Sequence, residues 1–351
     1  MSKSWNKFKG YMKALVKDKA EIGLHLKDVE VPKVGDNDVL IKVKSTAICG
    51  TDLHIWNWDS WASKTIKPPL TLGHEFMGTI HKVGANVDRF KVGERVSVES
   101  HIVGNRSRNA RAGRLHLDPD TINLGVDRNG AFAEFVCVPQ SNIVPLPDEV
   151  NDSIGSILDP FGNAVHASLS FDLAGEDVLI TGAGPIGIMS AAIAIHVGAR
   201  NVLLTDINDE RLKLAKKVCA TEVLNPSKSS IKDKMQEMGL REGFDVGLEM
   251  SGSEIALKDM IQNMMMGGNI ALLGLPSNPI NLDISEIIFK ALNIKAIYGR
   301  EIFETWYKGL ALLQSGLDIK NVITHEFHYS EYKKAFDLLN QGKAGKVILK
   351  W

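Results

Sequence analysis

Three side chains in the first part of the sequence could together bind a metal ion. Cys49 lies in AICGTDLHIW, and His74 and Glu75 lie in LGHEF. A thiolate, an imidazole and a carboxylate all bind zinc, and three protein ligands leave a fourth position open for a substrate oxygen. Taken singly, none of these residues indicates a metal site, because an isolated Cys is often a core residue and a His-Glu pair usually lies at the surface. With a further carboxylate at Asp159, in LDPFGNAVH, they predict a zinc site that could act as a Lewis acid.

A second group of residues could bind a dinucleotide. Gly182, Gly184 and Gly187 form G-x-G-x-x-G in DVLITGAGPIGIM, between a strand-like run and a helical one. In this motif the first glycine permits the tight turn, the second lets the backbone approach a pyrophosphate, and the third allows close packing of helix on strand. The helix N-terminus then offers unpaired N–H groups to the phosphates. An ordinary glycine turn in a flavodoxin-like fold is the alternative interpretation.

An acidic residue favours the dinucleotide interpretation. Asp206 ends the next strand-like run, 24 residues after Gly182, close to the offset of a ribose-binding carboxylate. Such a carboxylate would bind both adenosine ribose hydroxyls and repel a 2′-phosphate, so we expect NAD rather than NADP. The nearby Arg211 leaves the choice open. A zinc site followed by an NAD site predicts oxidation of an alcohol, with its hydride passing to nicotinamide.

The elements around the glycine motif indicate a doubly wound parallel sheet. Short β-rich runs alternate with amphipathic stretches, and parallel strands need crossovers of this length. The expected strands are 177–181, 201–206, 222–225, 244–250, 269–274 and 293–299, and the expected helices include 186–197, 208–219 and 253–266.

The first 150 residues instead predict an antiparallel β-domain, since β-rich runs are separated there by Gly, Pro and Asn turns. These runs are 38–48, 78–84, 94–100 and 131–138. The tail has helical patterns near 304–315 and 330–341 and then the strand KVILKW, and we expect it to pack back on the β-domain. The expected α/β protein thus has a catalytic domain of 1–158 with 304–351, and an NAD-binding domain of 159–303.

Composition argues against nucleic acid and membrane as partners. The 41 basic and 42 acidic residues nearly cancel, so no global field attracts polyanions. The basic N-terminal stretch MSKSWNKFKGYMKALVKDK lacks the apolar core of a signal peptide, and no run is long enough to span a bilayer. Three widely separated cysteines make a disulfide framework improbable. We therefore expect a cytoplasmic protein.

These motifs resemble the zinc-dependent medium-chain alcohol dehydrogenases. The resemblance runs from about Met12 to Trp351 and is most specific in AICGTDLHIWNWD, GHEF, DPFGNAVH, GAGPIGIM, GFDVGLEMSG and IYGREIFETWY. It implies a GroES-like β-domain, a Rossmann domain and a homotetramer. The last piece in particular is similar to members that oxidise L-threonine at its 3-hydroxyl to 2-amino-3-oxobutyrate. A polyol or diol dehydrogenase is the alternative within the family.

The resemblance also assigns roles to single residues. Thr51 and His54 match a proton relay, in which a hydroxyl passes the substrate proton toward an imidazole. Asp159 matches a carboxylate that ligates zinc directly or acts through zinc-bound water, and His101 matches a substrate-side residue. Cys49, His74 and Glu75 match the catalytic zinc ligands, and the expected NAD-binding residues are Gly182, Gly184, Ile186, Gly187, Asp206, Arg211, Leu273, Gly274, Leu275, Ile297 and Tyr298.

Two charged features have more than one interpretation. Arg300 and Glu301 could recognise a zwitterionic substrate, or only pair with each other or with another subunit. The stretch HIVGNRSRNARAGRLHLD (101–118) carries four arginines, and a non-enzymatic protein of this fold could use them to contact RNA. However, this stretch lacks the interleaved aromatic residues of a single-strand binder.

The family resemblance gives the stretch 101–118 another meaning. In the family this segment forms a lobe around a structural zinc held by four cysteines spaced C-x₂-C-x₂-C-x₇-C. Here those positions are Gly104, Ser107, Ala110 and Asp118, of which only Asp118 is a good donor. We therefore expect one catalytic zinc per chain and a metal-free lobe, mobile or packed on a neighbouring subunit. Asp118 is expected to pair with one of the arginines Arg106, Arg108 or Arg111.

Overall fold

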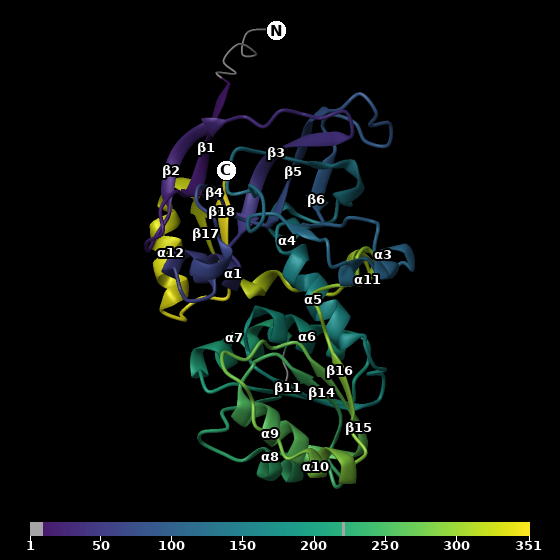
Figure 1. Ribbon diagram of the computed structural model, residues 1–351. Coiled ribbons are helices and arrows are strands. Elements are labelled where there is room, and N and C mark those ends of the chain that lie inside the picture. The colour runs from purple at the N-terminus through teal and green to yellow at the C-terminus, as the bar shows by residue number, and fades with distance from the viewer. Residues whose placement is uncertain (1–9, 220–221) are drawn as a thin grey trace. The chain divides into compact units, whose positions relative to one another are not determined.

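The computed structural model describes residues 10–219 and 222–351 and divides into two compact units (Figure 1). One unit comprises the chain up to Asp159 together with His325–Trp351, and the other is Pro160–Thr324. Residues 1–9, which hold much of the basic N-terminal stretch, lie outside the described residues. In the described part, no helix is both long and apolar enough to cross a membrane.

The first unit is built on antiparallel β-structure. A seven-stranded sheet has the order β10-β6-β5-β3-β18-β17, with β9 also paired to β3, and a three-stranded sheet has the order β2-β1-β4. The strands are β1 Tyr11–Lys17, β2 His25–Glu30, β3 Asp38–Ala47, β4 Leu70–Thr71, β5 Glu75–Val83, β6 Arg95–Val98, β9 Phe135–Pro139, β10 Ile143–Pro145, β17 Ile323–His328 and β18 Lys346–Lys350. A small hairpin, β7 His101–Ile102 with β8 Ile122–Asn123, leads into and out of the arginine-rich stretch.

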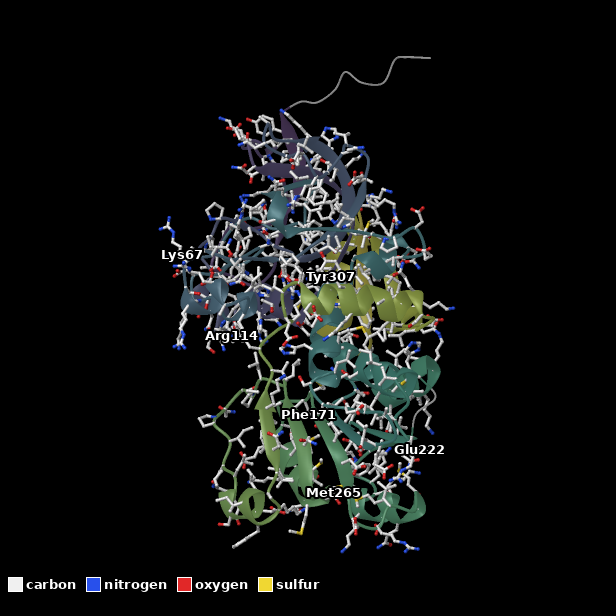
Figure 2. The ribbon with its side chains drawn as sticks, turned by 90° about the vertical axis from the view of Figure 1, so that its right-hand side faces the viewer. Lys67, Arg114, Phe171, Glu222, Met265 and Tyr307 are labelled. Atoms are coloured by element: carbon white, nitrogen blue, oxygen red, sulfur yellow. The ribbon has the colours of Figure 1, made fainter. Side chains whose placement is uncertain are left out.

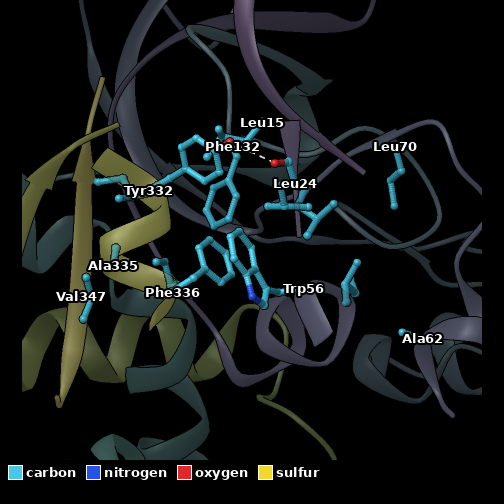
Figure 3. Packing of buried hydrophobic residues seen from close by; sticks show 14 of the residues in the cluster. Leu15, Leu24, Trp56, Ala62, Leu70, Phe132, Tyr332, Ala335, Phe336 and Val347 are labelled. Carbon is cyan, nitrogen blue, oxygen red and sulfur yellow. Dashed lines mark hydrogen bonds between the residues drawn. The ribbon is translucent and has the colours of Figure 1, made fainter. Parts of the chain in front are cut away.

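An aromatic core fixes two helices of this unit against each other (Figure 3). Trp56 of α1 (Gly50–Asn57) stacks on Phe336 of α12 (Tyr332–Asn340), with ring centroids 4.5 Å apart. The Tyr332 hydroxyl donates to the Leu24 carbonyl at 3.0 Å. Large apolar side chains on one face of each helix thereby position α1, which carries Thr51 and His54, over the sheet.

The second unit contains the expected doubly wound sheet. Six parallel strands have the order β13-β12-β11-β14-β15-β16, and the sequence order reverses between β11 and β14, where ligands bind in such folds. The strands are β11 Asp177–Thr181, β12 Asn201–Thr205, β13 Glu222–Leu224, β14 Phe244–Glu249, β15 Met264–Leu272 and β16 Asn293–Ala296. The helices are α5 Leu158–Ser168 at the junction of the units, α6 Pro185–His196, α7 Asp209–Cys219, α8 Ile231–Glu237, α9 Glu254–Asn263, α10 Ile284–Phe289 and α11 Glu304–Gln314.

The boundary between the units differs from the expected one. Residues 304–324, which the sequence patterns place with the β-domain, belong to the second unit. Asp159, expected to begin the NAD-binding domain, is instead the last residue of the first segment of the first unit. Helix α11 stays with the second unit because Gly309 packs against α5, where a Cβ atom built on it would lie 3.1 Å from Phe161. Trp306 of the same helix is buried under the Arg300 guanidinium.

One expected helix is also too long. The pattern predicted a helix over 253–266, but α9 ends at Asn263 and β15 begins at Met264. The Lys290 ammonium donates to the carbonyls of Ile261 and Met264 at the end of this helix, at 2.9 and 3.1 Å. A cation that binds the last carbonyls of a helix stabilises its C-terminus there.

Candidate metal centre and dinucleotide site

The fold brings Cys49, His74 and Glu75 together. Their candidate ligand atoms all lie within 4.8 Å of one another. The register of β3 and β5 explains this closeness, because Ala47 at the end of β3 pairs with Glu75 at the start of β5. Cys49 follows two residues after that pair, and His74 directly precedes it.

The start of α1 orients Cys49. Cys49 is the N-cap residue, and its backbone N–H donates to the Asp52 carboxylate at 2.9 Å. Asp52 is fully buried, and burial raises its pKa to about 6. Sequence reasoning missed Asp52, although an acidic residue three positions after a helix cap is a recognisable capping signal.

A buried lysine holds Glu75. The Lys346 ammonium of β18 contacts the Glu75 carboxylate and donates to the Ile48 carbonyl at 3.0 Å. Their side chains are 5% and 1% exposed. No local sequence pattern indicates this pair, because the two residues are 271 positions apart and meet only through pairing of β18 with β3.

The cluster has the chemistry that zinc requires. Among the described residues, His74 Nδ1, Glu75 Oε1 and Asp52 Oδ1 are buried polar atoms without a hydrogen-bond partner. Burial lowers the pKa of His74. The Cys49 sulfur and the carboxylates of Asp52 and Asp159 have the larger, opposite effect and raise the pKa to about 10. Sulfur, nitrogen and oxygen donors in a field that favours a cation fit a zinc ion.

Asp159 acts electrostatically on His74 of this cluster, and Asp159 and His101 are each held by a neighbour. Asp159 is buried, accepts a hydrogen bond from the Ser100 hydroxyl at 2.8 Å, and contributes to the raised pKa of His74. It is not one of the three clustered residues. The His101 ring contacts the carboxylate of the fully buried Glu99 at 2.9 Å.

Thr51 and His54, the two residues expected to relay a proton, lie on one side of α1. Thr51 Oγ1 is 3.8 Å from the Cys49 sulfur, next to the metal cluster. His54 follows three positions later, and residues at this spacing are neighbours on a helix surface. The His54 side chain is 61% exposed and contacts Asp59.

The glycine turn of the second unit has the backbone geometry expected of a pyrophosphate-binding turn. Gly182 adopts φ +96°, and a Cβ atom on Gly187 would lie 1.9 Å from the Gly182 carbonyl oxygen. Around Gly184, the N-cap residue of α6, a Cβ atom would meet no atom within 4 Å. The turn is therefore closed toward the sheet and open at the helix N-terminus, with half-buried Ile186 in its first turn.

Asp206 lies immediately after β12, close to this turn. Its carboxylate accepts backbone N–H groups of Ala183 and Asn208, each at 2.8 Å. Arg211 approaches the same carboxylate at 3.8 Å. These bonds fix the carboxylate beside the glycine turn, as binding of the adenosine ribose would require.

The remaining expected NAD-binding residues differ in exposure. Leu275 is 91% exposed and Tyr298 is also exposed, whereas Ile297 is buried. The backbone N–H groups of Leu273 and Gly274 both donate to the Glu249 carbonyl at 3.0 Å. The buried Glu249 carboxylate in turn accepts the Ser251 N–H at 2.8 Å, so Glu249 supports both loops at this edge of the sheet. Sequence reasoning did not identify it.

Arg300 and Glu301 have different surroundings. The Arg300 guanidinium is 5.8 Å from the Trp306 ring centroid, and Arg300 is only 2% exposed. Glu301 lies 3.7 Å from the buried His166, whose ring also contacts the Gly299 carbonyl. The structure thus places Arg300 inside its unit.

The lobe of residues 101–118 is held by Asp118. Its buried carboxylate accepts hydrogen bonds from the Ser107 side chain and from the Gly104 N–H, the latter at 2.7 Å. Burial raises the pKa of Asp118, but its hydrogen bonds outweigh burial, so the pKa is lowered. The Ser107 hydroxyl accepts the Ala110 N–H at 3.1 Å at the start of a short helix. The expected pairing of Asp118 with an arginine is therefore wrong: backbone amides and a hydroxyl occupy this carboxylate. The arginines are exposed, as Arg114 illustrates (Figure 2).

Two family models match the chain. The alcohol dehydrogenase GroES-like domain matches residues 35–148, and the zinc-binding dehydrogenase model matches residues 185–315. Cys49, His74 and Glu75 lie in the first range, and the second range begins at Pro185, within the glycine turn, and includes Asp206.

Curated relatives are similar along nearly the whole chain. The L-threonine 3-dehydrogenase of Rhizobium etli (strain CIAT 652) is 56% identical over 340 residues, which cover 97% of this chain and 99% of the relative. The L-threonine 3-dehydrogenase of Chromobacterium violaceum is likewise 56% identical, over 97% of this chain and 100% of its own.

Solved structures share the fold at lower identity. An alcohol dehydrogenase from Escherichia coli CFT073 complexed with NADH has a TM-score of 0.89 and 27% identity, over 97% of this chain and 100% of its own. The 2R,3R-butanediol dehydrogenase of Bacillus subtilis has a TM-score of 0.87 and 26% identity, over 97% and 99%. A protein from Sinorhizobium meliloti 1021 bound to NADP has a TM-score of 0.87 and 25% identity, over 98% and 100%. Both of these liganded neighbours thus bind a nicotinamide dinucleotide, NADH in one and NADP in the other.

Proposed function

Because the chain belongs to the zinc-dependent medium-chain alcohol dehydrogenase family, and is therefore an oxidoreductase, we propose that it oxidises L-threonine at the 3-hydroxyl to 2-amino-3-oxobutyrate. The observation that carries this proposal is the cluster of Cys49, His74 and Glu75 within 4.8 Å, in a chain 56% identical to L-threonine 3-dehydrogenases. A zinc-dependent dehydrogenase site needs ligands for the metal and a bound hydride acceptor, and the chain has candidate residues for both.

The side chains around the cluster have separate tasks in the proposed reaction. A zinc ion bound by Cys49, His74 and Glu75 supplies a Lewis acid, and NAD supplies the hydride acceptor. Thr51, next to the cluster, hydrogen-bonds the substrate hydroxyl and passes its proton toward His54. Asp159, held by Ser100, adds negative charge beside the cluster, and His101, held by Glu99, serves the substrate side.

NAD is the proposed cofactor rather than NADP. The fixed Asp206 carboxylate is suited to two ribose hydroxyls and repels a 2′-phosphate. Arg211 is engaged with that carboxylate, which leaves it less able to attract a phosphate.

We also propose one catalytic zinc per chain, a homotetramer, and work in the cytoplasm. Support for one zinc comes from the lobe, whose four former ligand positions form hydrogen bonds among themselves. Support for assembly comes from exposed apolar side chains in the segments that precede and follow the edge strand β16 in the sequence. Among them are Ile288, Phe289 and Tyr298. Apolar surface of this kind is typical of interfaces between subunits.

The test is NADH formation with L-threonine, 2,3-butanediol and 2-butanol, before and after chelation and after zinc is restored. We expect L-threonine to have by far the highest specificity constant, because a site built for charged groups leaves them unpaired with a neutral alcohol. Equal constants for L-threonine and either alcohol would favour a diol or general alcohol dehydrogenase. No NADH from any of the three would favour a non-enzymatic protein of this fold.

A further inference from the structure

The exposed relay residue His54 is held by a carboxylate that the relay itself does not include. His54 Nδ1 lies 2.5 Å from Asp59 Oδ2. The other carboxylate oxygen, Oδ1, accepts the backbone N–H groups of Trp61 at 3.0 Å and Ala62 at 2.9 Å. Asp59 therefore spans two partners: one oxygen is anchored to the backbone, and the other faces the imidazole.

A tight turn after α1 creates this arrangement. Trp58 adopts the left-handed conformation, with φ +52°, and its N–H donates to the Ile55 carbonyl at 3.3 Å. The Asp59 N–H then returns to the His54 carbonyl at 3.4 Å. A left-handed residue ends a helix and reverses the chain, so the turn brings Asp59 back alongside the last turn of α1.

Aromatic and cationic contacts hold the turn in place. The Lys17 ammonium lies 4.8 Å from the Trp58 ring centroid. The Trp61 ring meets the His54 ring edge-on, with centroids 6.1 Å apart. His54 thus has a carboxylate at one ring nitrogen and an indole against its ring, although most of its side chain is exposed.

We propose that Asp59 is a positioning residue for His54. Its carboxylate accepts a hydrogen bond from Nδ1–H, which leaves Nε2 as the nitrogen that exchanges the substrate proton. In a neutral imidazole only one nitrogen carries a proton, and the hydrogen bond to one decides the role of the other. This inference rests on the proposed relay through His54. The bond from the Ala62 N–H, with that from His54, lowers the pKa of Asp59, so the carboxylate is charged near neutral pH.

The informative variant is Asp59→Asn. The amide keeps an oxygen for the Trp61 and Ala62 N–H groups but turns an NH₂ toward His54, where it favours the opposite tautomer. We expect the ¹⁵N NMR spectrum of His54 to change from the Nδ1–H to the Nε2–H form. We expect kcat to fall toward the value of His54→Ala, a loss of up to about 10²–10⁴-fold, with zinc content and the KM for NAD unchanged.

Two further variants separate positioning from folding. Asp59→Ser keeps a short acceptor for the Ala62 N–H and removes the contact with His54. We therefore expect a lowered kcat without a large change in melting temperature. Asp18→Asn is the matched control, because Asp18 contacts His25 Nδ1 at 2.6 Å in the same unit but His25 has no part in the proposed relay. It should leave kcat unchanged.

The outcomes distinguish this inference from the function on which it rests. If His54→Ala keeps the wild-type kcat, the relay itself is wrong and the inference falls with it. If His54→Ala loses kcat while Asp59→Asn retains both the wild-type kcat and the Nδ1–H tautomer, only the positioning role of Asp59 is overturned. A changed tautomer together with a lowered kcat in Asp59→Asn supports it.

Discussion

Glu75 illustrates how the role of a single residue depends on a distant partner. The carboxylate is almost completely buried, and one of its oxygens contacts the Lys346 ammonium while the other has no hydrogen-bond partner in the described chain. A buried carboxylate is tolerated only when its charge is compensated. Lys346 compensates one oxygen, which leaves the other for a metal ion.

Lys346→Met should therefore destabilise the first unit strongly. Removing one partner of a buried ion pair leaves an uncompensated charge, which typically costs about 3–5 kcal/mol. Urea unfolding of the zinc-free protein measures the change. The control is Lys350→Met on the same strand, whose partner Glu326 is exposed, so it should cost no more than about 1 kcal/mol. Equal losses for the two variants would contradict the importance of burial.

Asp206→Asn tests the cofactor preference. The amide has one oxygen, so it can accept only one of the Ala183 and Asn208 N–H groups, which now bind different carboxylate oxygens, and it loses the negative charge. Hydrogen bonds to charged groups are worth about 1.5–3 kcal/mol, so the KM for NAD should rise about tenfold or more. Activity with NADP should rise at the same time, because the repulsion of its 2′-phosphate is removed. Steady-state kinetics with both cofactors decide this, and a wild-type preference for NADP would refute the assignment.

Among the elements, the lobe of residues 101–118 carries hydrogen bonds at the positions where the family resemblance implies zinc ligands. Gly104, Ser107, Ala110 and Asp118 occupy the family's cysteine positions and remain close, as the bonds from Gly104 to Asp118 and from Ala110 to Ser107 demonstrate. These hydrogen bonds link the four positions in two pairs, Gly104 with Asp118 and Ser107 with Ala110.

Metal analysis of protein purified without chelators should find at most one zinc per chain. Replacing all four positions by cysteine (G104C, S107C, A110C, D118C) should add a second zinc, since four nearby thiolates complete a structural site. Asp118→Asn alone should speed hydrogen exchange at the Gly104 amide and leave the zinc content unchanged. Two tightly bound zinc ions in the natural chain would contradict this interpretation.

For the whole molecule, the important feature is that each unit has a core of its own. Apolar clusters around Trp56 and Phe336, and around Ile41 and Val96, lie in the first unit, and the cluster around Phe244 lies in the second. The candidate metal ligands belong to the first unit and the glycine turn to the second. The two binding sites can therefore be separated experimentally.

Chelation should abolish turnover but not NADH binding. The glycine turn and Asp206 are supported by contacts within the second unit, so removal of zinc should leave them in place. A fluorescence titration with NADH, with and without chelator, measures this, and added zinc should restore turnover. Loss of NADH affinity on chelation would mean that the two sites depend on each other.

Features that depend on neighbouring residues could be predicted from the sequence. The six parallel strands, the glycine turn with Asp206, and the candidate ligands His74 and Glu75 follow from periodicity, glycine spacing and residue type, which act over a few tens of residues. The closeness of Cys49 to His74 also follows once β3 and β5 pair, but their register needed the structure.

Contacts between distant segments could not be predicted in this way and are known from the fold alone. The pairing of Lys346 with Glu75, the assignment of α11 to the second unit, and the backbone partners of Asp118 all differ from or go beyond the sequence-based expectations. No local pattern encodes them, because a buried charge or an apolar helix face can be satisfied by many partners. Which partner it meets is set by packing of the whole unit.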